Sequence, residues 1–335
     1  MEQNFFSKKR VLVTGGTGML GMALIQFLCE YGARVRAASM DDPRHLPEGI
    51  EFLKMDLTQW ESCRRACQGM DFVFHLAGVK GGVGIGQTQA ARFFEVNTLI
   101  NLHMLKAARE SGVERYLFTS SVGVYPDAEI FREDEVWDKP PHPSDRYGAW
   151  SKRIGELQCE AYLEQYGYKT CIVRPSAIYG PYDNFNPKTA MVISALINRV
   201  VSGENPLVVW GDGSQVRDFI YSKDCARGMI LSMVKYYECD PVNLGSGVGV
   251  TIREVVETIL KHTPQKPELV WDTSKPMGNR IRLMDMTKAR KKLGFQPDYS
   301  LERGIKETVE WYLANQDYQL RKYNAFVEQT KEGGV

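Results

Sequence analysis

The chain lacks long apolar runs: none approaches the ~20 consecutive apolar residues that a helix needs to cross a bilayer. It also lacks an excess of basic charge, because 42 lysines and arginines balance 41 aspartates and glutamates to a net charge of +1. Proteins that neutralise the phosphates of nucleic acids or of membrane surfaces usually carry such an excess. The sequence therefore argues against a membrane span and against binding to nucleic acids or membranes.

Signals for disulfides, metal sites and secretion are missing too. The seven cysteines are scattered and odd in number, and no histidine or further cysteine pair completes a metal site with Cys63 and Cys67. We expect buried, reduced thiols and no metal. The first ten residues, MEQNFFSKKR, contain no apolar core of a secretory signal. The prediction is a cytoplasmic globular protein whose 335 residues form one large domain or two.

A glycine-rich turn is the most informative feature that is present. Residues 11–21 read VLVTGGTGMLG, where an apolar run, Arg10–Val13, predicts a buried strand and the following pattern predicts a helix. Gly15 permits the tight turn, Gly18 lets the backbone approach a pyrophosphate, and Gly21 lets the helix pack close to the strand. Because a helix N-terminus offers free N–H groups to phosphates, this context predicts a dinucleotide site.

Strand-like and helix-like patterns alternate through the first half of the chain. Such alternation predicts an α/β protein, with a Rossmann-type, doubly wound parallel sheet and helices on both of its faces. The expected strands are Arg10–Val13, Arg34–Ala38, Glu51–Lys54, Phe72–Leu76, Arg115–Thr119 and Thr170–Val173. The expected helices are Met19–Tyr31, Trp60–Cys67, Ala90–Glu110 and Tyr147–Tyr166.

The pattern changes after Arg174-Pro175, where loops become frequent. We predict a dinucleotide-binding domain at residues 1–175, with return segments near 215–248, and a smaller α/β substrate-binding cap formed mainly by residues 176–335. The substrate is expected between the two parts, outside the carboxyl ends of the strands. The later elements expected are a helix at Ala190–Val201, strands at Asp218–Tyr221 and Asp240–Leu244, and a polar surface helix after Asn315.

Several motifs form one ordered series along the chain. They are VTGGTGMLG at the first turn, Asp56-Leu57 after a strand, HLAG at His75–Gly78, Asn97, TSSVGVYP at Thr119–Pro126, Tyr147 and Lys152. The series resembles the extended short-chain dehydrogenase/reductase superfamily, the NAD(P)-dependent nucleotide-sugar epimerases and dehydratases, over nearly the whole chain. Residues 174–187, 211–228, 243–247 and 271–295 resemble more closely the GDP-L-fucose synthase family, whose members epimerise and reduce a GDP-4-keto-6-deoxy-mannose.

The resemblance implies a nicotinamide dinucleotide as cofactor. Its expected contacts are Gly15, Thr17, Gly18, Met19, Leu20, Gly21, Ser39, Arg44, Asp56, Leu57, Leu76, Ala77, Gly78, Asn97, Tyr147, Lys152, Pro175 and Ile178. Ser39 stands where NAD enzymes usually carry an acidic residue, so it would not repel a 2′-phosphate. Nearby charges that could meet or oppose that phosphate, or be solvated surface, are Arg36, Arg44, His45, Asp41 and Asp42. We favour NADP and leave NAD open.

The resemblance assigns catalysis to Ser121, Tyr147 and Lys152. In the family the tyrosine gives a proton, the lysine lowers its pKa and the serine binds the carbonyl. The family spacing is Tyr-x-x-x-Lys, but YGAWSK is one residue longer. Helical residues four apart differ in direction by about 40°, and residues five apart by about 140°. A π-bulge around Gly148–Trp150 could absorb the extra residue, Tyr147 could precede the helix, or the acid is displaced and the chemistry altered or lost. His75 is interpreted as a packed residue rather than a catalyst.

For the nucleotide sugar, the resemblance implies contacts from Val122, Gly123, Asn184, Asn186, Lys188, Val192, Trp210, Arg217 and Arg280, with the arginines on the diphosphate. Two departures affect the family's acid/base pair for epimerisation at C3 and C5. Gly123 replaces its cysteine and Asn186 replaces its histidine, and neither side chain transfers protons near neutral pH. We therefore expect redox chemistry at C4 of a GDP-(4-keto-6-deoxy)hexose or a related GDP-sugar, without 3,5-epimerisation.

Two other functions stay open. A nucleotide-sugar 4-epimerase would keep its NAD bound and recycle it, and a non-catalytic regulatory protein would bind cofactor without turnover. A dehydratase is disfavoured because Val122-Gly123, rather than Asp-Glu, follow Ser121. The helices expected at Ala90–Glu110 and Tyr147–Tyr166 resemble those that pair as a four-helix bundle in family dimers, so we expect a homodimer.

Overall fold

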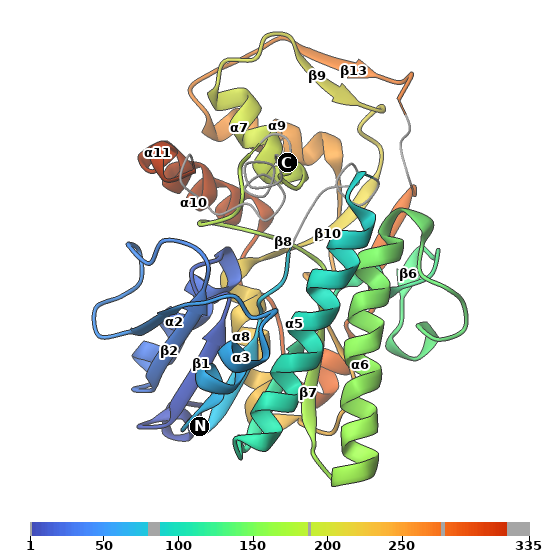
Figure 1. The fold of residues 1–335 in the computed structure, drawn as a ribbon. Coiled ribbons are helices and arrows are strands. Elements are labelled where there is room, and N and C mark those ends of the chain that lie inside the picture. Colours follow the sequence, from blue (N-terminus) through green and yellow to red (C-terminus); the bar gives the residue numbers. More distant parts are fainter. Residues whose placement is uncertain (1, 80–87, 187–188, 276–278, 320–335) are drawn as a thin grey trace, which may run out of the picture.

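Seven parallel strands form the central sheet, in the order β11-β7-β5-β4-β1-β2-β3 (Figure 1). The structure is a computed structural model that describes residues 2–79, 88–186, 189–275 and 279–319. These strands are β1 (Arg10–Thr14), β2 (Arg34–Ser39), β3 (Glu51–Lys54), β4 (Phe72–His75), β5 (Arg115–Thr119), β7 (Thr170–Pro175) and β11 (Val242–Leu244). The strand order reverses between β1 and β4, and ligands of such sheets bind at the carboxyl ends beside this reversal.

Helices cover both faces of the sheet, as the alternating pattern predicts. On one face α2 (Met19–Glu30) packs against α8 (Ser222–Lys235), with α1 (Glu2–Phe6) beside α8. On the other face lie α3 (Trp60–Cys67), α5 (Ala90–Glu110) and α6 (Arg146–Tyr166), and Figure 1 shows α5 and α6 running side by side. The strands β4 and β7 are buried at every position, which is typical of parallel strands covered on both faces. The predicted fold class is confirmed.

A smaller cap lies at the carboxyl ends of the central strands (Figure 1). Its sheet has the order β12-β10-β14-β6, with β8 paired to β10, and a separate pair joins β9 to β13. These strands are β6 (Ile130–Phe131), β8 (Ala177–Tyr179), β9 (Leu207–Trp210), β10 (Val216–Tyr221), β12 (Gly249–Thr251), β13 (Leu269–Asp272) and β14 (Ile281–Met284). The cap helices α7 (Val192–Val201), α9 (Ile252–His262) and α10 (Leu301–Ala314) surround a core of their own.

The elements that were predicted lie within two residues of their predicted bounds, whereas the long helices α8, α9 and α10 and several short elements were not expected from the sequence. The unexpected short elements are α1, η1 (Val122–Val124), η2 (Glu133–Glu135), η3 (Pro143–Asp145), η4 (Ala289–Leu293) and the strands β6, β8, β9 and β12 to β14, and α11 spans Gln316–Gln319. β11 joins the first sheet from the predicted return segment, and β6 crosses the other way to pair with β14. The surface helix expected after Asn315 corresponds to α11 only in part, because residues 320–335 lie outside the described residues.

Candidate active site

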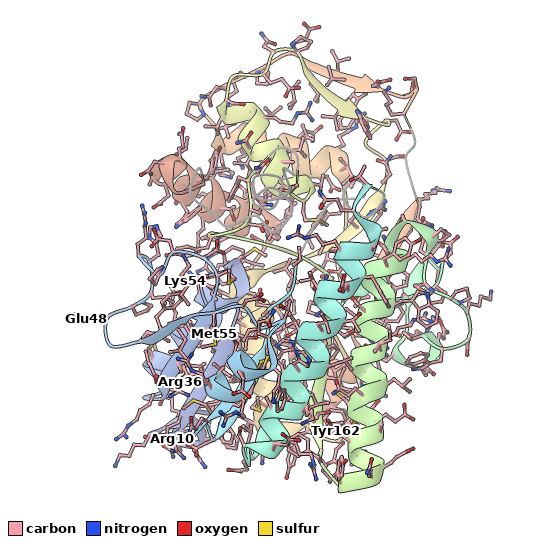
Figure 2. All side chains as sticks on the ribbon, in the orientation of Figure 1. Arg10, Arg36, Glu48, Lys54, Met55 and Tyr162 are labelled. Carbon is pink, nitrogen blue, oxygen red and sulfur yellow. The ribbon has the colours of Figure 1, made fainter. Side chains whose placement is uncertain are left out.

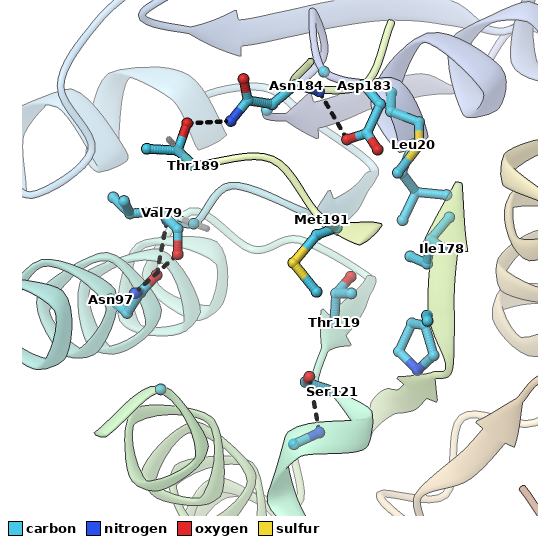
Figure 3. Close-up of a pocket in the computed structure, with 18 of the residues that line it drawn as sticks. Leu20, Val79, Asn97, Thr119, Ser121, Ile178, Asp183, Asn184, Thr189 and Met191 are labelled. Carbon is cyan, nitrogen blue, oxygen red and sulfur yellow. Dashed lines mark hydrogen bonds between the residues drawn. The ribbon is translucent and has the colours of Figure 1, made fainter. Parts of the chain in front are cut away.

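A cavity of about 1530 Å³ opens at the carboxyl ends of the central strands, beneath the cap. Pockets for one drug-sized ligand usually measure about 300–1,000 Å³, so this volume has room for a dinucleotide and a second ligand. Figure 3 shows side chains from the central sheet, such as Thr119 and Ser121, facing Asn184, Thr189 and Met191 of the segment that leads into the cap.

Most predicted contacts line this cavity. Those found in its lining are Gly15, Gly18, Met19, Leu20, Gly21, Ser39, Asp56, Leu57, Leu76, Ala77, Gly78, Asn97, Ser121, Val122, Gly123, Tyr147, Lys152, Pro175, Ile178, Asn184, Asn186, Val192, Trp210 and Arg217. Thr17, Arg44 and Arg280 are not in the lining, and Lys188 lies outside the described residues. One cavity thus brings together residues that are spread over most of the chain.

The glycine-rich turn has the geometry that a pyrophosphate requires. Gly15 has φ +67°, a left-handed conformation that side chains disfavour, and it lies against Ala77 of the neighbouring strand end. A Cβ on Gly21 would come within 2.3 Å of the Gly15 carbonyl oxygen, so only glycine lets α2 approach this closely. Gly18 caps α2, whose N-terminus carries free N–H groups. The turn therefore fits a dinucleotide phosphate.

A buried hydrogen-bond chain fixes the strand ends beside this turn. Thr14 Oγ1 accepts hydrogen bonds from the amides of Leu76 and Ala77, at 3.1 and 3.0 Å. Its own hydrogen points to Nδ1 of His75, 2.9 Å away, and Nε2 of His75 lies 3.1 Å from Oδ1 of Asn101. Complete burial, aided by the charge of Lys152, lowers the pKa of His75 to about 3. His75 is a neutral, packed residue, as the sequence indicates.

The arginines near the expected adenosine end form ion pairs within the chain. Ser39 lines the cavity and accepts a hydrogen bond from Thr17 Oγ1 at 2.6 Å, which explains why Thr17 is buried behind it. Arg36 points away, because it pairs with Glu51 at 2.9 Å and donates to the carbonyl oxygens of Ala66 and Gln68. Figure 2 labels Arg36 on the central sheet, on the side remote from the cap.

Arg44 and the two neighbouring aspartates follow Ser39 in the chain, but Asp41 is the one of these three that lines the cavity. Arg44 forms an ion pair with Asp42 at 2.6 Å, whereas Asp41 lines the cavity next to Ser39. The rings of His45 and Tyr182 lie edge to face at 5.6 Å. At this end of the cavity the neutral hydroxyl of Ser39 is compatible with the 2′-phosphate of NADP, whereas the carboxylate of Asp41 would repel it.

The catalytic candidates Ser121, which follows β5, and Lys152, which belongs to α6, both line the cavity. The geometry of α6 rules out two of the explanations offered for the longer spacing between Tyr147 and Lys152. α6 is a regular α-helix from Arg146 onward, so no π-bulge is present around residues 148–150. Tyr147 does not precede the helix either, because it is the second residue of α6. The extra residue in YGAWSK is therefore not absorbed, and Tyr147 is displaced around the helix relative to Lys152.

Two arginines from neighbouring cap strands meet in the cavity. β10 and β14 pair in parallel with Arg217 opposite Arg282, so both side chains leave the sheet on the same face. Burial, aided by the charge of Arg282, lowers the pKa of Arg217 to about 10, which leaves it charged at neutral pH. Arg282 also pairs with Asp145 at 3.0 Å. Arg282, which the sequence interpretation did not name, thus lines the cavity, whereas the predicted Arg280 is exposed and lies outside the lining.

The loop before the cap is tied down by its own polar groups. Asn184 donates to Thr189 Oγ1 at 2.7 Å (Figure 3). It also accepts from the amide of Asn186 at 3.0 Å. Ser194 donates to the buried carboxylate of Asp183. Trp210, at the rim, is 63% exposed. These residues surround the second part of the cavity, opposite the glycine-rich turn.

Four buried polar atoms in the cavity wall have no hydrogen-bond partner among the described residues: Thr119 Oγ1, Ser120 Oγ, Ser176 Oγ and Gln215 Oε1. A buried polar group left unpaired costs about 1–3 kcal/mol, so such atoms usually bind a ligand or water. The sequence interpretation did not single them out. Their position directly after or at the carboxyl ends of strands was the signal that could have found Thr119, Ser120 and Ser176.

Comparisons with known proteins show which family this chain is similar to. A model of the NAD dependent epimerase/dehydratase family matches residues 11–245. The chain is 32% identical over 326 residues to GDP-L-fucose synthase of Escherichia coli (strain K12), covering 93% of this chain and 98% of that protein. It is 30% identical over 320 residues to GDP-mannose 3,5-epimerase 1 of Oryza sativa subsp. japonica, covering 92% and 83%.

The chain belongs to the NAD-dependent epimerase/dehydratase family. Among solved structures, the Naegleria fowleri GDP-L-fucose synthetase bound to NADP has a TM-score of 0.79 at 26% identity, covering 92% of this chain and 94% of that one. The Thermus thermophilus UDP-glucose 4-epimerase in complex with NAD has 0.78 at 29% identity, covering 91% and 99%. The predictions of a family enzyme and of a nicotinamide dinucleotide cofactor are confirmed.

Two structural findings concern other predictions. In the part of the chain that the structure describes, no helix combines the length and apolar character needed to cross a membrane. Within the same part, no cluster of histidine, cysteine, aspartate or glutamate side chains could hold a metal ion. The cysteines that the structure describes form no disulfide, and burial raises the pKa of the Cys63 thiol to about 12.

Proposed function

We propose that this protein is an NADP(H)-dependent oxidoreductase that acts at C4 of a GDP-(4-keto-6-deoxy)hexose and does not epimerise C3 or C5. The observation that carries the proposal is the pair Gly123 and Asn186. Both line the cavity where the family resemblance expects a cysteine and a histidine, and neither can take or give a proton at a sugar carbon. The proposal is also supported by Ser121, Tyr147 and Lys152, which line the same cavity.

Each part of the apparatus has a chemical role in the proposed reaction. The bound nicotinamide would supply or accept a hydride at C4. Ser121 Oγ accepts a hydrogen bond from the Gly123 amide at 3.1 Å, so its hydroxyl hydrogen is available to the C4 oxygen. Arg217 and Arg282 form a paired cationic wall suited to a diphosphate. Asn97 fixes the loop after β4, since it accepts from the amide of Val79 at 2.9 Å (Figure 3).

The test combines two measurements on one reaction. The purified protein is mixed with NADPH and GDP-4-keto-6-deoxy-mannose, and the near-ultraviolet absorbance of NADPH is followed. The proposal expects NADPH to be consumed and, in deuterated water, no deuterium at C3 or C5 of the product. Deuterium at either carbon would show epimerisation and contradict the proposal, and the absence of NADPH oxidation would contradict its redox part.

A matched variant tests the role of the two replaced residues. A Cβ on Gly123 would meet its nearest neighbours, Asp145 Cβ and Ser121 Oγ, at 3.5 Å, which is ordinary contact. The double change Gly123→Cys with Asn186→His should therefore fold, and we expect it to introduce solvent deuterium into the product. Each single variant is the control, because one acid/base side chain without its partner is expected to introduce much less deuterium at C3 and C5.

One observation supports a second candidate, a 4-epimerase that keeps NAD bound. Asp41 lines the cavity beside Ser39, and a carboxylate there favours the ribose hydroxyls of NAD over a 2′-phosphate. This function predicts that NAD copurifies with the protein and that nucleotide sugars interconvert without net NADPH consumption. Mass spectrometry of the denatured, freshly purified protein identifies the dinucleotide directly.

A further inference from the structure

The register of α6 determines which residue shares a helix face with Lys152, although Tyr147 and Lys152 both line the cavity. Because α6 is regular, the residue one turn before Lys152 on the same face is Gly148, four positions earlier. Tyr147 is five positions earlier and points about 140° away from Lys152. Its side chain is 41% exposed, and the guanidinium of Arg146 lies 5.7 Å from its ring centroid. The helix therefore directs Tyr147 away from the Lys152 side.

Phe93 of α5 fills the space that a side chain at position 148 would need. A Cβ added to Gly148 would lie 2.7 Å from Cε1 and 3.2 Å from Cζ of Phe93, closer than real Cβ atoms approach a neighbour. Phe93 lines the cavity, and its backbone carbonyl accepts a hydrogen bond from Asn97 at 2.8 Å. A phenyl ring donates no proton. Position 148 and its neighbour on α5 thus offer no acid to the reacting oxygen.

Lys152 lies at the strand ends that carry the rest of the apparatus. Its Nζ is 3.8 Å from the point where a Cβ of Gly78 would lie and 5.2 Å from the ring centroid of Phe118. Gly78 follows β4, and Phe118 belongs to β5, which leads to Ser121. The ammonium of Lys152 is therefore held beside the same two strand ends that line the cavity with Ala77 and Ser121.

We propose that Lys152, rather than Tyr147, gives the proton to the C4 oxygen; this rests on the proposed reduction at C4. In that step a C–H bond forms at C4 with the hydride of the reduced nicotinamide, which is oxidised. The C=O π bond breaks, and its electron pair moves to the oxygen. An O–H bond forms there as an N–H bond of the Lys152 ammonium breaks, and the neutral amine then regains a proton from water. Ser121 donates a hydrogen bond to the same oxygen.

The experiment compares three variants of the full-length protein by kcat, its pH profile and NADPH binding. Tyr147→Phe is expected to lower kcat less than tenfold and to keep the shape of the pH profile. Lys152→Ala is expected to lower kcat by two orders of magnitude or more, the usual size of a general-acid effect. Lys152→Arg keeps the charge, but arginine does not deprotonate in proteins, so it should be as slow as Lys152→Ala. NADPH binding, measured by fluorescence, should persist in all three.

Amine rescue separates a proton donor from a positive charge. Primary amines added to Lys152→Ala should restore turnover, with a rate that depends on the pKa of the amine, whereas they should not change the rate of Tyr147→Phe. A Tyr147→Phe variant that binds NADPH but loses two orders of magnitude in kcat would overturn the proposal. Wild-type rates in Lys152→Arg would overturn it too. If the wild-type protein oxidises no NADPH with ketosugars, the proposed function fails, which is a separate result.

Discussion

At the scale of single residues, Gly21 and Gly167 illustrate two different reasons for glycine. At Gly21 the neighbouring backbone leaves no room for a Cβ, whereas Gly167 ends α6 at φ +63° with no atom near its missing Cβ. We expect Gly21→Ala to destabilise the protein by about 2 kcal/mol or more and to weaken dinucleotide binding, because α2 must move away from β1. Gly167→Ala should cost about 1 kcal/mol and leave binding unchanged. Thermal unfolding and NADPH titration measure both, and equal binding losses would contradict this explanation.

His75 should make the protein sensitive to acid. Its pKa is about 3 in the folded protein because of burial, while an unfolded histidine titrates near its ordinary value of about 6.5. Below pH 6.5 the unfolded state takes up a proton that the folded state excludes, so stability falls as pH decreases between these two values. His75 alone should make the free energy of unfolding fall by about 1.4 kcal/mol per pH unit near pH 4 to 5. Urea unfolding of His75→Gln should show a smaller slope there, and an unchanged slope would contradict the assignment.

Arg280 and Arg282 show that residue patterns cannot tell which of two nearby arginines lines the cavity. Both arginines stand in the same short segment, and the sequence contains no signal that selects one of them. The selection is made by the pairing of β14 with β10, which sets Arg282 opposite Arg217. Such a register depends on contacts between residues 65 positions apart in the chain. The glycines of the first turn, in contrast, carry a local signal, and the strand, turn and helix that they predict are present.

At the scale of elements, Phe93 of α5 packs against Gly148 of α6, and variants of these two residues test the contact between the helices. Gly148→Ala should destabilise the protein by about 1–3 kcal/mol, because the added methyl group overlaps the Phe93 ring. Phe93→Leu removes the aromatic edge, so the double variant should lose less than the sum of the two single variants. A double-mutant cycle by chemical denaturation measures this coupling. Additive losses would show that the ring does not fill the space beside Gly148.

The elements themselves divide into those with and without a local signal. Strands such as β1 and β4 are continuous apolar runs bounded by turns, and helices such as α3 and α5 have clear periodicity, so their bounds were predicted closely. β6 and β8 contain two and three residues, too few for a period to be visible. Their pairing partners β14 and β10 lie far away in the chain. The pairing of the cap strands could therefore not be predicted from patterns.

At the scale of the whole molecule, the predicted homodimer gives the exposed face of α6 a role. Trp150 and Leu157 are 37% and 53% exposed, and their spacing of seven residues puts them on one stripe of the helix. Exposed large apolar side chains in such a stripe are typical of a surface that a second helix covers. The resemblance to family dimers expects α5 and α6 of two copies to form a four-helix bundle there, since these helices already pack together within one chain.

Sedimentation velocity tests this prediction on the intact protein. The wild-type chain should sediment as a dimer, and Trp150→Glu with Leu157→Glu should sediment as a monomer, because two buried carboxylates per copy would have to be desolvated in the bundle. Glu160→Gln, an exposed change on the same helix, is the matched control and should remain dimeric. Trp150 and Leu157 lie outside the cavity lining, so the monomeric variant should still bind NADPH. A wild-type monomer would contradict the prediction, and lost NADPH binding in the monomer would show that the active site depends on the partner copy.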